Sequence, residues 1–463
     1  MKLNLTPPLK PSYWQDSIPP VQVLPALSGE QQADIVIIGG GFVGLWTALT
    51  IKEYEPDCKV VVLEQDICGG GASGRNGGMV MSWWPKISSL NVLCSPEETL
   101  FLANASERAI SELGEFCLQH NIDAHFVQKG WLWTATTPAH VNAWDSTLKV
   151  CERLGAAPFE RLSVEDLQRR TGSSSHLAGV LEASNATVQP FALVQGMRRV
   201  ALEKGVSIYE KSGVTNIVSG NPVQVQTKGG VIAAQKVVLA TNAWSTSIPA
   251  LARTIAAVNS SIVVTKKLNE QQAWQGGECI TDSQLLVNYY RKTHDGRIAF
   301  GKGTGAMSYG SIINEVFSED TESIDMTRDD FFKIYSTMDK EIVEQSWSGP
   351  IDRTFDSLPV FGSLSAHNNI FYGIGWSGNG VGPSRLGGRI LASIALERDN
   401  EWSQCSLVDR AYKPFPPEPF RYLGGRLVRR AVIRKEQAEM SGRDANVLDR
   451  WLAGLAPAGL EDK

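Results

Sequence analysis

The order of apolar and polar positions near the amino end predicts a strand, a turn, a helix and a second strand. The run 34–38 is short and β-branched, which is typical of a buried parallel strand. A glycine-rich turn follows, and a helical pattern then continues to Tyr54, where Pro56 ends it. Residues 59–64 form the next apolar run. Because two strands joined through a helix lie parallel, these segments predict one βαβ unit.

Four further stretches extend this pattern along the chain. A long helix is predicted over 97–120, an apolar strand over 237–240, and a strand followed by a helix over 370–397. The stretch 260–300 is rich in predicted strands. This arrangement favours an α/β protein that is α+β overall. Residues 1–30 are rich in proline and predict an extended arm along the surface.

The composition fits a globular protein and excludes several other classes. A length of 463 residues, at roughly 150 residues per domain, suggests two or three domains. Lys and Arg number 44 and Asp and Glu number 49, so the net charge of −5 gives no general attraction to nucleic acid. The apolar fraction of 43% and the charged fraction of 20% exclude a disordered chain.

Cysteines and histidines indicate neither disulfides nor a metal site. The seven cysteines are scattered, their number is odd, and no CxxC pair occurs. The six histidines show no ligand spacing. The amino end lacks the apolar stretch of a signal peptide, and glycines interrupt the uncharged run 35–51, which is short for a membrane span. We therefore expect a cytoplasmic protein with reduced thiols and without a metal.

The glycine pattern that follows the first predicted strand indicates a bound dinucleotide. In Gly39-x-Gly41-x-x-Gly44 the first glycine permits the turn, the second lets the backbone approach a pyrophosphate, and the third lets the helix pack on the strand. The free N–H groups at the helix start then face the phosphates. Glu64 ends the second strand, where an acid binds ribose hydroxyls and repels the 2′-phosphate of NADP. NAD or FAD therefore remain.

Two later glycine clusters favour flavin over NAD. The loop 69–78 offers many backbone N–H groups and the cation Arg75, which suit the acceptor edge and the developing negative charge of an isoalloxazine ring. The cluster 373–381 precedes a helix whose N-terminus would stabilise the same edge electrostatically. Taken alone, the first loop also fits a flexible surface loop, and the second an ordinary strand-to-helix turn.

The same segments resemble those of a known family. The runs DIVIIGGGFVGLWTALTI, GASGRNGG, KVVLATNAW, WSGPIDRTFDSLPVFG and GIGWSGNGVGPSRLGGRILA occur in this order. They are similar to segments of the D-amino-acid-oxidase-like superfamily of FAD amine oxidoreductases. Within it, the chain most resembles γ-glutamylputrescine-oxidase-like proteins and a branch associated with aminophosphonates. The resemblance covers about residues 12–440.

The resemblance implies a discontinuous Rossmann-type FAD-binding domain and a substrate domain on a mixed or antiparallel sheet. FAD would be bound non-covalently, with Val214 near the adenine and Thr241 near the pyrophosphate. The implied division is an arm at 1–30, an FAD-binding domain at 31–90, 190–250 and 345–405, a substrate domain at 91–189 and 251–344, and a basic helical tail at 406–463. The expected FAD contacts are Gly39, Gly41, Phe42, Val43, Gly44, Glu64, Ala72, Ser73, Arg75, Asn76, Gly77, Gly78, Val214, Thr241, Asn242, Trp244, Gly375, Gly378, Asn379, Gly380 and Val381.

The expected chemistry follows from the single nucleotide motif. Because the sequence shows no second nucleotide site for NAD(P)H, we expect the substrate itself to reduce the flavin. An amine C–H bond is a good hydride donor to flavin N5, and the resulting imine is hydrolysed to a carbonyl compound and ammonia or an amine. Molecular oxygen or another acceptor then takes up the electrons. Two alternatives stay open: an oxidoreductase for a hydroxy acid or polyol, and a non-catalytic flavin-binding protein.

Departures from the family pattern narrow the expected substrate. Glycine-oxidase-like relatives hold the substrate carboxylate with Arg where this chain has Ile351 and Gly378, and sarcosine-oxidase-like relatives use a Lys where it has Gly382. This argues against a simple α-amino acid. A small amine is expected instead, and a basic site would suit an anionic group such as that of an aminoalkylphosphonate or its N-methyl derivative. The candidate substrate contacts are Trp84, Tyr289, Tyr290, Arg291, Lys302 and Arg353, and Lys302 is also the candidate catalytic residue.

The stretch 420–435 contains six basic residues and no acid. A basic amphipathic helix of this kind can bind a membrane surface. The favoured interpretation is a helix packed on the FAD-binding domain with a solvated basic face. No nucleic-acid partner is expected, and the sequence leaves the oligomeric state open.

Overall fold

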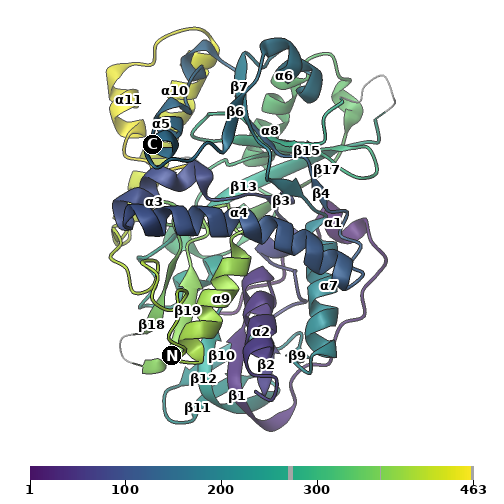
Figure 1. The fold of residues 1–463 in the computed structure, drawn as a ribbon, viewed down its shortest axis with the longest axis vertical. Helices are drawn as coiled ribbons and strands as arrows, with labels where there is room; N and C mark the ends of the chain where they lie inside the picture. The colour runs from purple at the N-terminus through teal and green to yellow at the C-terminus, as the bar shows by residue number, and fades with distance from the viewer. Residues whose placement is uncertain (269–274, 365–366, 460–463) are drawn as a thin grey trace.

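The computed structural model describes residues 1–268, 275–364 and 367–459. Two large sheets occupy the two halves of the molecule, and helices α3 (Ile87–Leu93) and α4 (Pro96–Gln119) cross between them (Figure 1). One sheet combines parallel and antiparallel pairs around the predicted βαβ unit, and the other is mainly antiparallel. The predicted α/β class with α+β character is confirmed.

The first sheet forms around β1 (Gly29–Ile38). This strand pairs in parallel with β2 (Val60–Leu63) on one side and with β12 (Gly230–Leu239) on the other. The apolar residues of β1 and β2 are buried, as continuous apolar runs in a parallel sheet require. The remaining strands are β9 (Ser207–Tyr209), β10 (Val214–Val218), β11 (Val223–Thr227), β18 (Val360–Leu364) and β19 (His367–Ile374), in the order β10-β11-β12-β1-β2-β9, with β19 pairing β12 and β18.

The second sheet is assembled from two distant segments of the chain. Its order is β17-β13-β16-β15-β14-β5-β7-β6, and only the β14–β5 pair among these described strands is parallel. A small sheet of order β3-β8-β4 lies apart from both. The strands are β3 (Met79–Val80), β4 (Val127–Gln128), β5 (Trp131–Ala135), β6 (Phe159–Arg161), β7 (Ala178–Glu182), β8 (Ala186–Thr187), β13 (Ala256–Thr265), β14 (Cys279–Thr281), β15 (Asn288–Lys292), β16 (Ile298–Lys302) and β17 (Val343–Arg353).

Helices cover the first sheet on the face seen in Figure 1. There α2 (Phe42–Tyr54) packs against α9 (Ser384–Ala395) so closely that a Cβ at Gly388 would lie 2.6 Å from the Cβ of Trp46. Helix α7 (Pro190–Glu203) packs on the other side of α2. The remaining α-helices are α1 (Tyr13–Asp16), α5 (Asp145–Arg153), α6 (Val164–Thr171), α8 (Thr321–Ile334), α10 (Phe420–Met440) and α11 (Val447–Ala453).

Helix α4 packs into the core beside the first sheet. The predicted division put residues 91–189 in the substrate domain, yet Leu102, Ile110 and Leu113 of α4 are buried in the same core as Trp46 of α2. The helix is amphipathic, and its apolar face completes the covering of the first sheet. The division into domains stays a prediction.

Candidate functional site

The first cavity lies where β1 ends and α2 begins. Gly39 has a φ of +116°, and a Cβ there would lie 2.4 Å from the carbonyl oxygen of Ala240, so this turn requires glycine. The first turn of a helix leaves N–H groups without helical partners, and the Phe42 N–H donates to the Ser73 Oγ at 2.9 Å. The remaining donors of this turn border a cavity of about 140 Å³. Such an edge suits the phosphates of a nucleotide.

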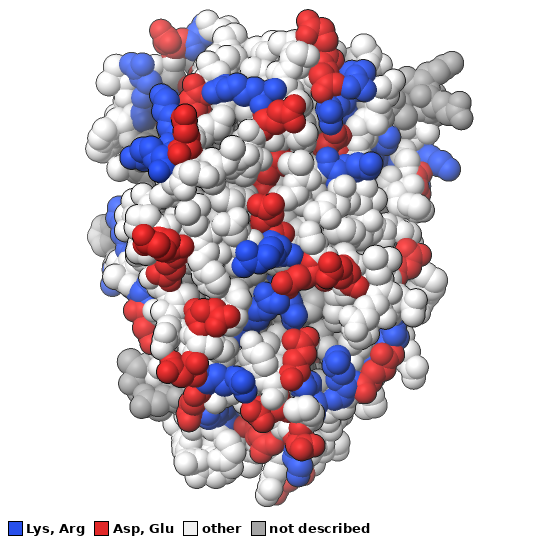
Figure 2. All heavy atoms as spheres, in the orientation of Figure 1, with Lys and Arg blue, Asp and Glu red and all other residues white. Residues whose placement is uncertain are grey.

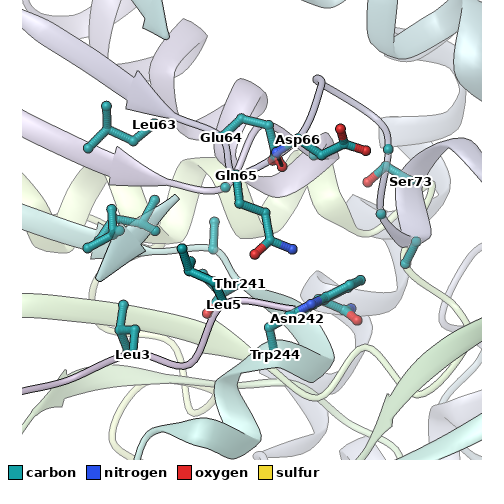
Figure 3. Close-up of a pocket in the computed structure, with 18 of the residues that line it drawn as sticks. Leu3, Leu5, Leu63, Glu64, Gln65, Asp66, Ser73, Thr241, Asn242 and Trp244 are labelled. Carbon is teal, nitrogen blue, oxygen red and sulfur yellow. Dashed lines mark hydrogen bonds between the residues drawn. The ribbon is translucent and has the colours of Figure 1, made fainter. Parts of the chain in front are cut away.

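Glu64 lies at the carboxyl end of β2, on the rim of this cavity. Its two carboxylate oxygens accept the N–H groups of Gly40 at 2.8 Å and Asp66 at 2.9 Å. Burial raises the pKa of this carboxyl to about 7, although these two hydrogen bonds oppose the shift. Figure 3 shows Asn242 and Trp244 across the cavity from Glu64. The cavity therefore has an acid on one side and an aromatic ring on the other.

The amino-terminal arm covers the first cavity, which the sequence did not reveal. The segment 3–9 contributes most of its residues to the lining, and Leu3 and Leu5 are visible there in Figure 3. The arm is fixed farther along, because the Ser12 Oγ donates to the Gly74 carbonyl at 2.7 Å and the Trp14 Nε1 to the Asn76 carbonyl at 2.8 Å. Most residues of the arm are exposed or half-buried, so it lies along the surface and in addition borders this cavity.

A second cavity of about 170 Å³ adjoins the first. The two share lining residues, among them Phe42, Ser73 and Asn242. The second cavity continues between the loop after η1 (Ala72–Gly74), strand β17 and the turn that precedes α9. Together the cavities make an elongated space that joins the two large sheets.

Asp352 is a residue of the second cavity that the sequence analysis did not single out. Its carboxylate accepts the backbone N–H of Gly375 at 2.6 Å and of Trp376 at 3.1 Å. Burial raises its pKa to about 7, and the accepted N–H groups oppose that shift. The carboxylate thus fixes the third glycine cluster against β17. Its position in the quoted run WSGPIDRTFDSLPVFG was the available signal.

Arg75 and Asn76 hold the second glycine cluster in shape. The guanidinium of Arg75 donates to the Ser348 carbonyl from Nε at 3.0 Å and from Nη2 at 2.7 Å, and also to the Lys10 carbonyl. Asn76 donates to the Ser73 carbonyl at 2.8 Å, and its Oδ1 accepts the Gly78 N–H. Burial lowers the pKa of Arg75 only to about 10, so it stays charged at the wall of the second cavity.

The predicted FAD contacts lie together. Three of them, Gly44, Gly78 and Gly375, line neither cavity but shape the backbone beside it: a Cβ at Gly44, for instance, would lie 1.9 Å from the Gly39 carbonyl oxygen. Their contact with a cofactor stays a prediction. The predicted residues that line one or both cavities are Gly39, Gly41, Phe42, Val43, Glu64, Ala72, Ser73, Arg75, Asn76, Gly77, Val214, Thr241, Asn242, Trp244, Gly378, Asn379, Gly380 and Val381.

Two of the predicted substrate contacts, Tyr289 and Arg353, line the second cavity. The Tyr289 hydroxyl is 2.7 Å from the Ser260 Oγ. Burial raises the pKa of Tyr289 to about 12, so its hydroxyl stays protonated and can act as a donor. Both residues remain predicted substrate contacts.

The other four predicted substrate contacts line neither cavity, and each has a partner elsewhere in the interior. The Trp84 Nε1 donates to Glu107 at 2.6 Å. The Tyr290 ring stacks on Phe300 with centroids 4.9 Å apart, on the strand face opposite Tyr289.

The cations Arg291 and Lys302 are also turned away from the second cavity. Arg291 donates from Nε to the Gly77 carbonyl at 2.8 Å and lies over the Trp14 ring, so it supports the loop 69–78. The Lys302 ammonium is 2.7 Å from an Asp330 carboxylate oxygen.

The contacts of Lys302 favour a structural role, and the catalytic role expected for it stays a prediction. Its ammonium also donates to the Leu286 carbonyl at 2.7 Å. Burial opposes its charge, but Glu436, Asp330 and Asp282 outweigh burial and raise its pKa. A lysine held protonated in this way is unsuited to act as a base.

The basic tail forms helix α10, as expected, but it packs elsewhere. Val432 is buried against Leu286 of the second half of the molecule, not on the FAD-binding side. Its cations have acidic partners: Arg429 pairs with Glu322 at 3.0 Å, for example. Figure 2 shows Lys and Arg beside Asp and Glu at the upper left, where α10 and α11 lie in Figure 1. Among the described residues, no helix is long and apolar enough to cross a bilayer.

Comparison with protein families shows which family the chain belongs to. Residues 34–394 match the model of the FAD dependent oxidoreductase (DAO) family. The chain belongs to this family. It is therefore an FAD-dependent oxidoreductase, and the match includes the segments that supply all three glycine clusters.

Individual relatives agree with this assignment. Gamma-glutamylputrescine oxidoreductase of Escherichia coli is 28% identical over 439 residues, which cover 94% of this chain and 98% of that protein. Probable oxidoreductase OrdL of Haemophilus influenzae is 28% identical over 406 residues, which cover 85% of this chain and 89% of that protein. Among solved structures, glycine oxidase from Geobacillus kaustophilus superposes with a TM-score of 0.66 at 20% identity, covering 82% of this chain and all of the other.

The geometry fits FAD. An elongated space with helix N–H donors and an acid at one end suits the nucleotide half of FAD, and the mainly apolar second cavity suits the ring half. The first and second glycine clusters lie where a backbone must approach closely, because a Cβ at Gly41 would meet the Ser73 Oγ at 2.7 Å. The residues present therefore fit the cofactor that the family uses.

Proposed function

We propose that this enzyme oxidises a small primary or secondary amine. FAD, when bound, supplies the two-electron acceptor for this reaction. The bound cofactor would take up the hydride of the C–H bond beside the amine nitrogen, and water would hydrolyse the resulting imine to a carbonyl compound and ammonia or a smaller amine. Molecular oxygen or another acceptor then takes up the two electrons.

The observation that carries this proposal is that the second cavity adjoins the nucleotide cavity. Its wall is largely apolar, with Ile262, Met81 and Ile351 among the lining residues. An apolar cavity disfavours an ammonium and so favours the neutral amine, which is the form that donates hydride. The names of the relatives point the same way, since gamma-glutamylputrescine oxidoreductase and glycine oxidase both carry amine substrates in their names.

Orientation, not a dedicated base, is the proposed contribution of the surrounding side chains. Tyr289, with a pKa of about 12, keeps its proton at neutral pH and would donate a hydrogen bond. Asp352 already accepts two backbone N–H groups and acts as a positioning residue for the turn before α9. A substrate that binds as the neutral amine would need no further proton acceptor for hydride loss, so these side chains would act by orienting it.

Within this class, we propose an amine that also carries an anionic group. The permanent charge of Arg353 at the cavity wall supports this choice. The first candidates to be measured are 2-aminoethylphosphonate and its N-methyl derivative, with γ-glutamylputrescine as the reference amine.

The test is anaerobic titration of the flavin-loaded protein with these amines, with glycine and with alcohols of matched carbon skeleton. At least one amine is expected to abolish the oxidised flavin absorption and to yield one carbonyl product per flavin. Reduction by the alcohols but by none of the amines would establish the hydroxy acid or polyol alternative instead. A flavin that stays oxidised with every compound would contradict catalysis on either class.

A matched pair of variants locates the substrate. Tyr289→Phe removes one hydroxyl from the second cavity, and Tyr309→Phe makes the same change at a tyrosine that is 57% exposed. Loss of one hydrogen bond, about 1 kcal/mol, should weaken amine binding about fivefold in the first variant only. Equal binding by both variants would remove Tyr289 from the site.

A further inference from the structure

A third cavity, of about 400 Å³, lies next to the second. The two share Val287, Gly303, Ile351 and Arg353 in their linings. This volume falls within the range of small-molecule sites, which is roughly 300–1,000 Å³. The third cavity, here called the tail chamber, is therefore large enough for a part of a substrate that extends away from the reacting amine.

The carboxyl-terminal part of the chain forms the outer wall of the tail chamber. The Arg353 guanidinium donates to the Ala458 carbonyl, and the Ala458 N–H donates to the Phe355 carbonyl at 3.1 Å. The Phe415 N–H donates to the Arg253 carbonyl at 2.8 Å, and the Arg253 Nε donates to the Phe415 carbonyl at 2.8 Å. These bonds make the wall a fixed part of the fold.

Helix α10 is anchored in the same way. The Glu436 carboxylate accepts the Leu286 N–H at 2.8 Å, and the Leu286 carbonyl in turn accepts the Lys302 ammonium. The Arg429 Nε donates to the Thr304 carbonyl at 2.8 Å. The buried lysine that does not reach the second cavity thus helps to position the wall of the third.

The charged residues that line the tail chamber are all cations. Among its described lining residues there are four cations and no acid. Two of the cations, Arg421 and Arg429, have carboxylate partners, but the partner of Arg429, Glu322, is 71% exposed and lies outside the lining. The second terminal nitrogen of Arg429 is buried without a hydrogen-bond partner in the described structure. The ammonium of Lys413 lies 4.0 Å from the centroid of the Phe355 ring.

Apart from Asn259, the rest of the lining consists of apolar residues and glycines. Val258, Leu286 and Met307 suit methylene groups, and Phe420 and Leu455, which are 68% and 49% exposed, border the chamber at the surface. An apolar space with cations and without acids favours a ligand that combines a hydrocarbon chain with an anionic end.

We propose that the tail chamber binds the remote, anionic end of an elongated amine substrate while the amine itself lies in the second cavity. Lys413 and the unpartnered nitrogen of Arg429 would hold the anion, either a carboxylate or a phosphonate. This inference rests on the proposed amine oxidation, and it adds that chain length and a remote charge select the substrate.

Binding without turnover tests the chamber separately from catalysis. Titration calorimetry of the flavin-loaded protein with straight-chain carboxylates, phosphonates and alcohols of four to ten carbons measures the preference for an anion. We expect at least one anionic series to bind about tenfold more tightly than the alcohols, with affinity rising with length and falling with added salt. The better of the two anions identifies the head group.

Two pairs of variants assign this preference. Lys413→Met should lower this anion preference, and Lys413→Glu should eliminate it. Lys340→Met and Lys340→Glu make the same changes at an exposed lysine that lines none of the three cavities, and they should leave it intact. The Lys413 variants should also lose any preference for ω-amino acids over alkylamines of equal length as anaerobic reductants of the flavin.

The outcomes separate the two proposals. Equal binding of anions and alcohols, or an anion preference untouched by Lys413→Glu, would overturn the tail chamber even if simple amines reduce the flavin. An anion preference that depends on Lys413, in a protein whose flavin no amine reduces, would support the chamber and contradict amine oxidation.

Discussion

Single buried carboxylates hold the loops of this active site in shape. Glu64 accepts backbone N–H groups from Gly40 and Asp66, and Asp352 accepts them from Gly375 and Trp376. Burial raises the pKa of both acids to about 7. An enclosed carboxylate is tolerated when backbone donors replace its water, and the loops beside the cofactor gain a fixed shape in return.

Glu182 offers a direct test of how such acids respond to pH. One of its oxygens accepts the Ser82 and Ser184 hydroxyls at 2.6 and 2.9 Å, whereas the other has no partner in the described structure. Burial raises its pKa from 4.5 to about 7. Because the pKa of Glu182 is higher in the folded than in the unfolded state, its contribution to the free energy of unfolding is full below about pH 4.5. That contribution is lost as the pH rises through 7.

We therefore expect Glu182→Gln to gain stability relative to the parent protein as the pH rises from 5 to 8, by up to about 3 kcal/mol. Urea unfolding at both pH values measures the difference, with the exposed Glu401→Gln as the control. A difference in unfolding free energy that does not change with pH would show that Glu182 is ionised throughout.

At the scale of elements, the strand–turn–helix unit has almost no spare room. Gly39 lies against Ala240, which directly follows β12, and Gly44 of α2 lies against the carbonyl of Gly39 in the turn. The turn can approach a pyrophosphate only because the helix start is pressed against β1. Stability and cofactor binding are therefore coupled in this unit.

Gly44→Ala tests that coupling. Its Cβ would lie 1.9 Å from the Gly39 carbonyl oxygen, so the helix must move, at a cost of about 3 kcal/mol, and FAD should be lost. Gly424→Ala is the matched control, because in α10 a Cβ there meets nothing within 4 Å and alanine favours the helix by about 1 kcal/mol. Thermal unfolding and flavin content report both effects, and retention of FAD by Gly44→Ala would contradict the account.

Local patterns predicted the elements around the cofactor better than the residues around the substrate. Glycines at fixed spacing act within one turn, so sequence alone placed the turn after β1. Strand alternation showed that Tyr290 and Arg291 face opposite ways, but not that Tyr289 would be the one to line the cavity. The partners of Lys302 come from distant segments, Asp330 of α8 and Glu436 of α10, and no local pattern reports them.

At the scale of the whole molecule, both chain ends enclose the functional space. The amino-terminal arm covers the nucleotide cavity, and the carboxyl-terminal segment walls the tail chamber. Neither segment has the apolar periodicity of a core element. The sequence therefore indicated an extended arm and a basic helix, but not that they line cavities. The three cavities adjoin one another in sequence, because the first shares lining residues with the second and the second with the third.

The central claim is that the three glycine clusters surround one FAD, and the most direct measurement is the flavin content of the purified protein. The account predicts one FAD per chain, released intact by acid because it is not covalently attached, and restored when FAD is added back. A colourless protein that takes up no added FAD would contradict it.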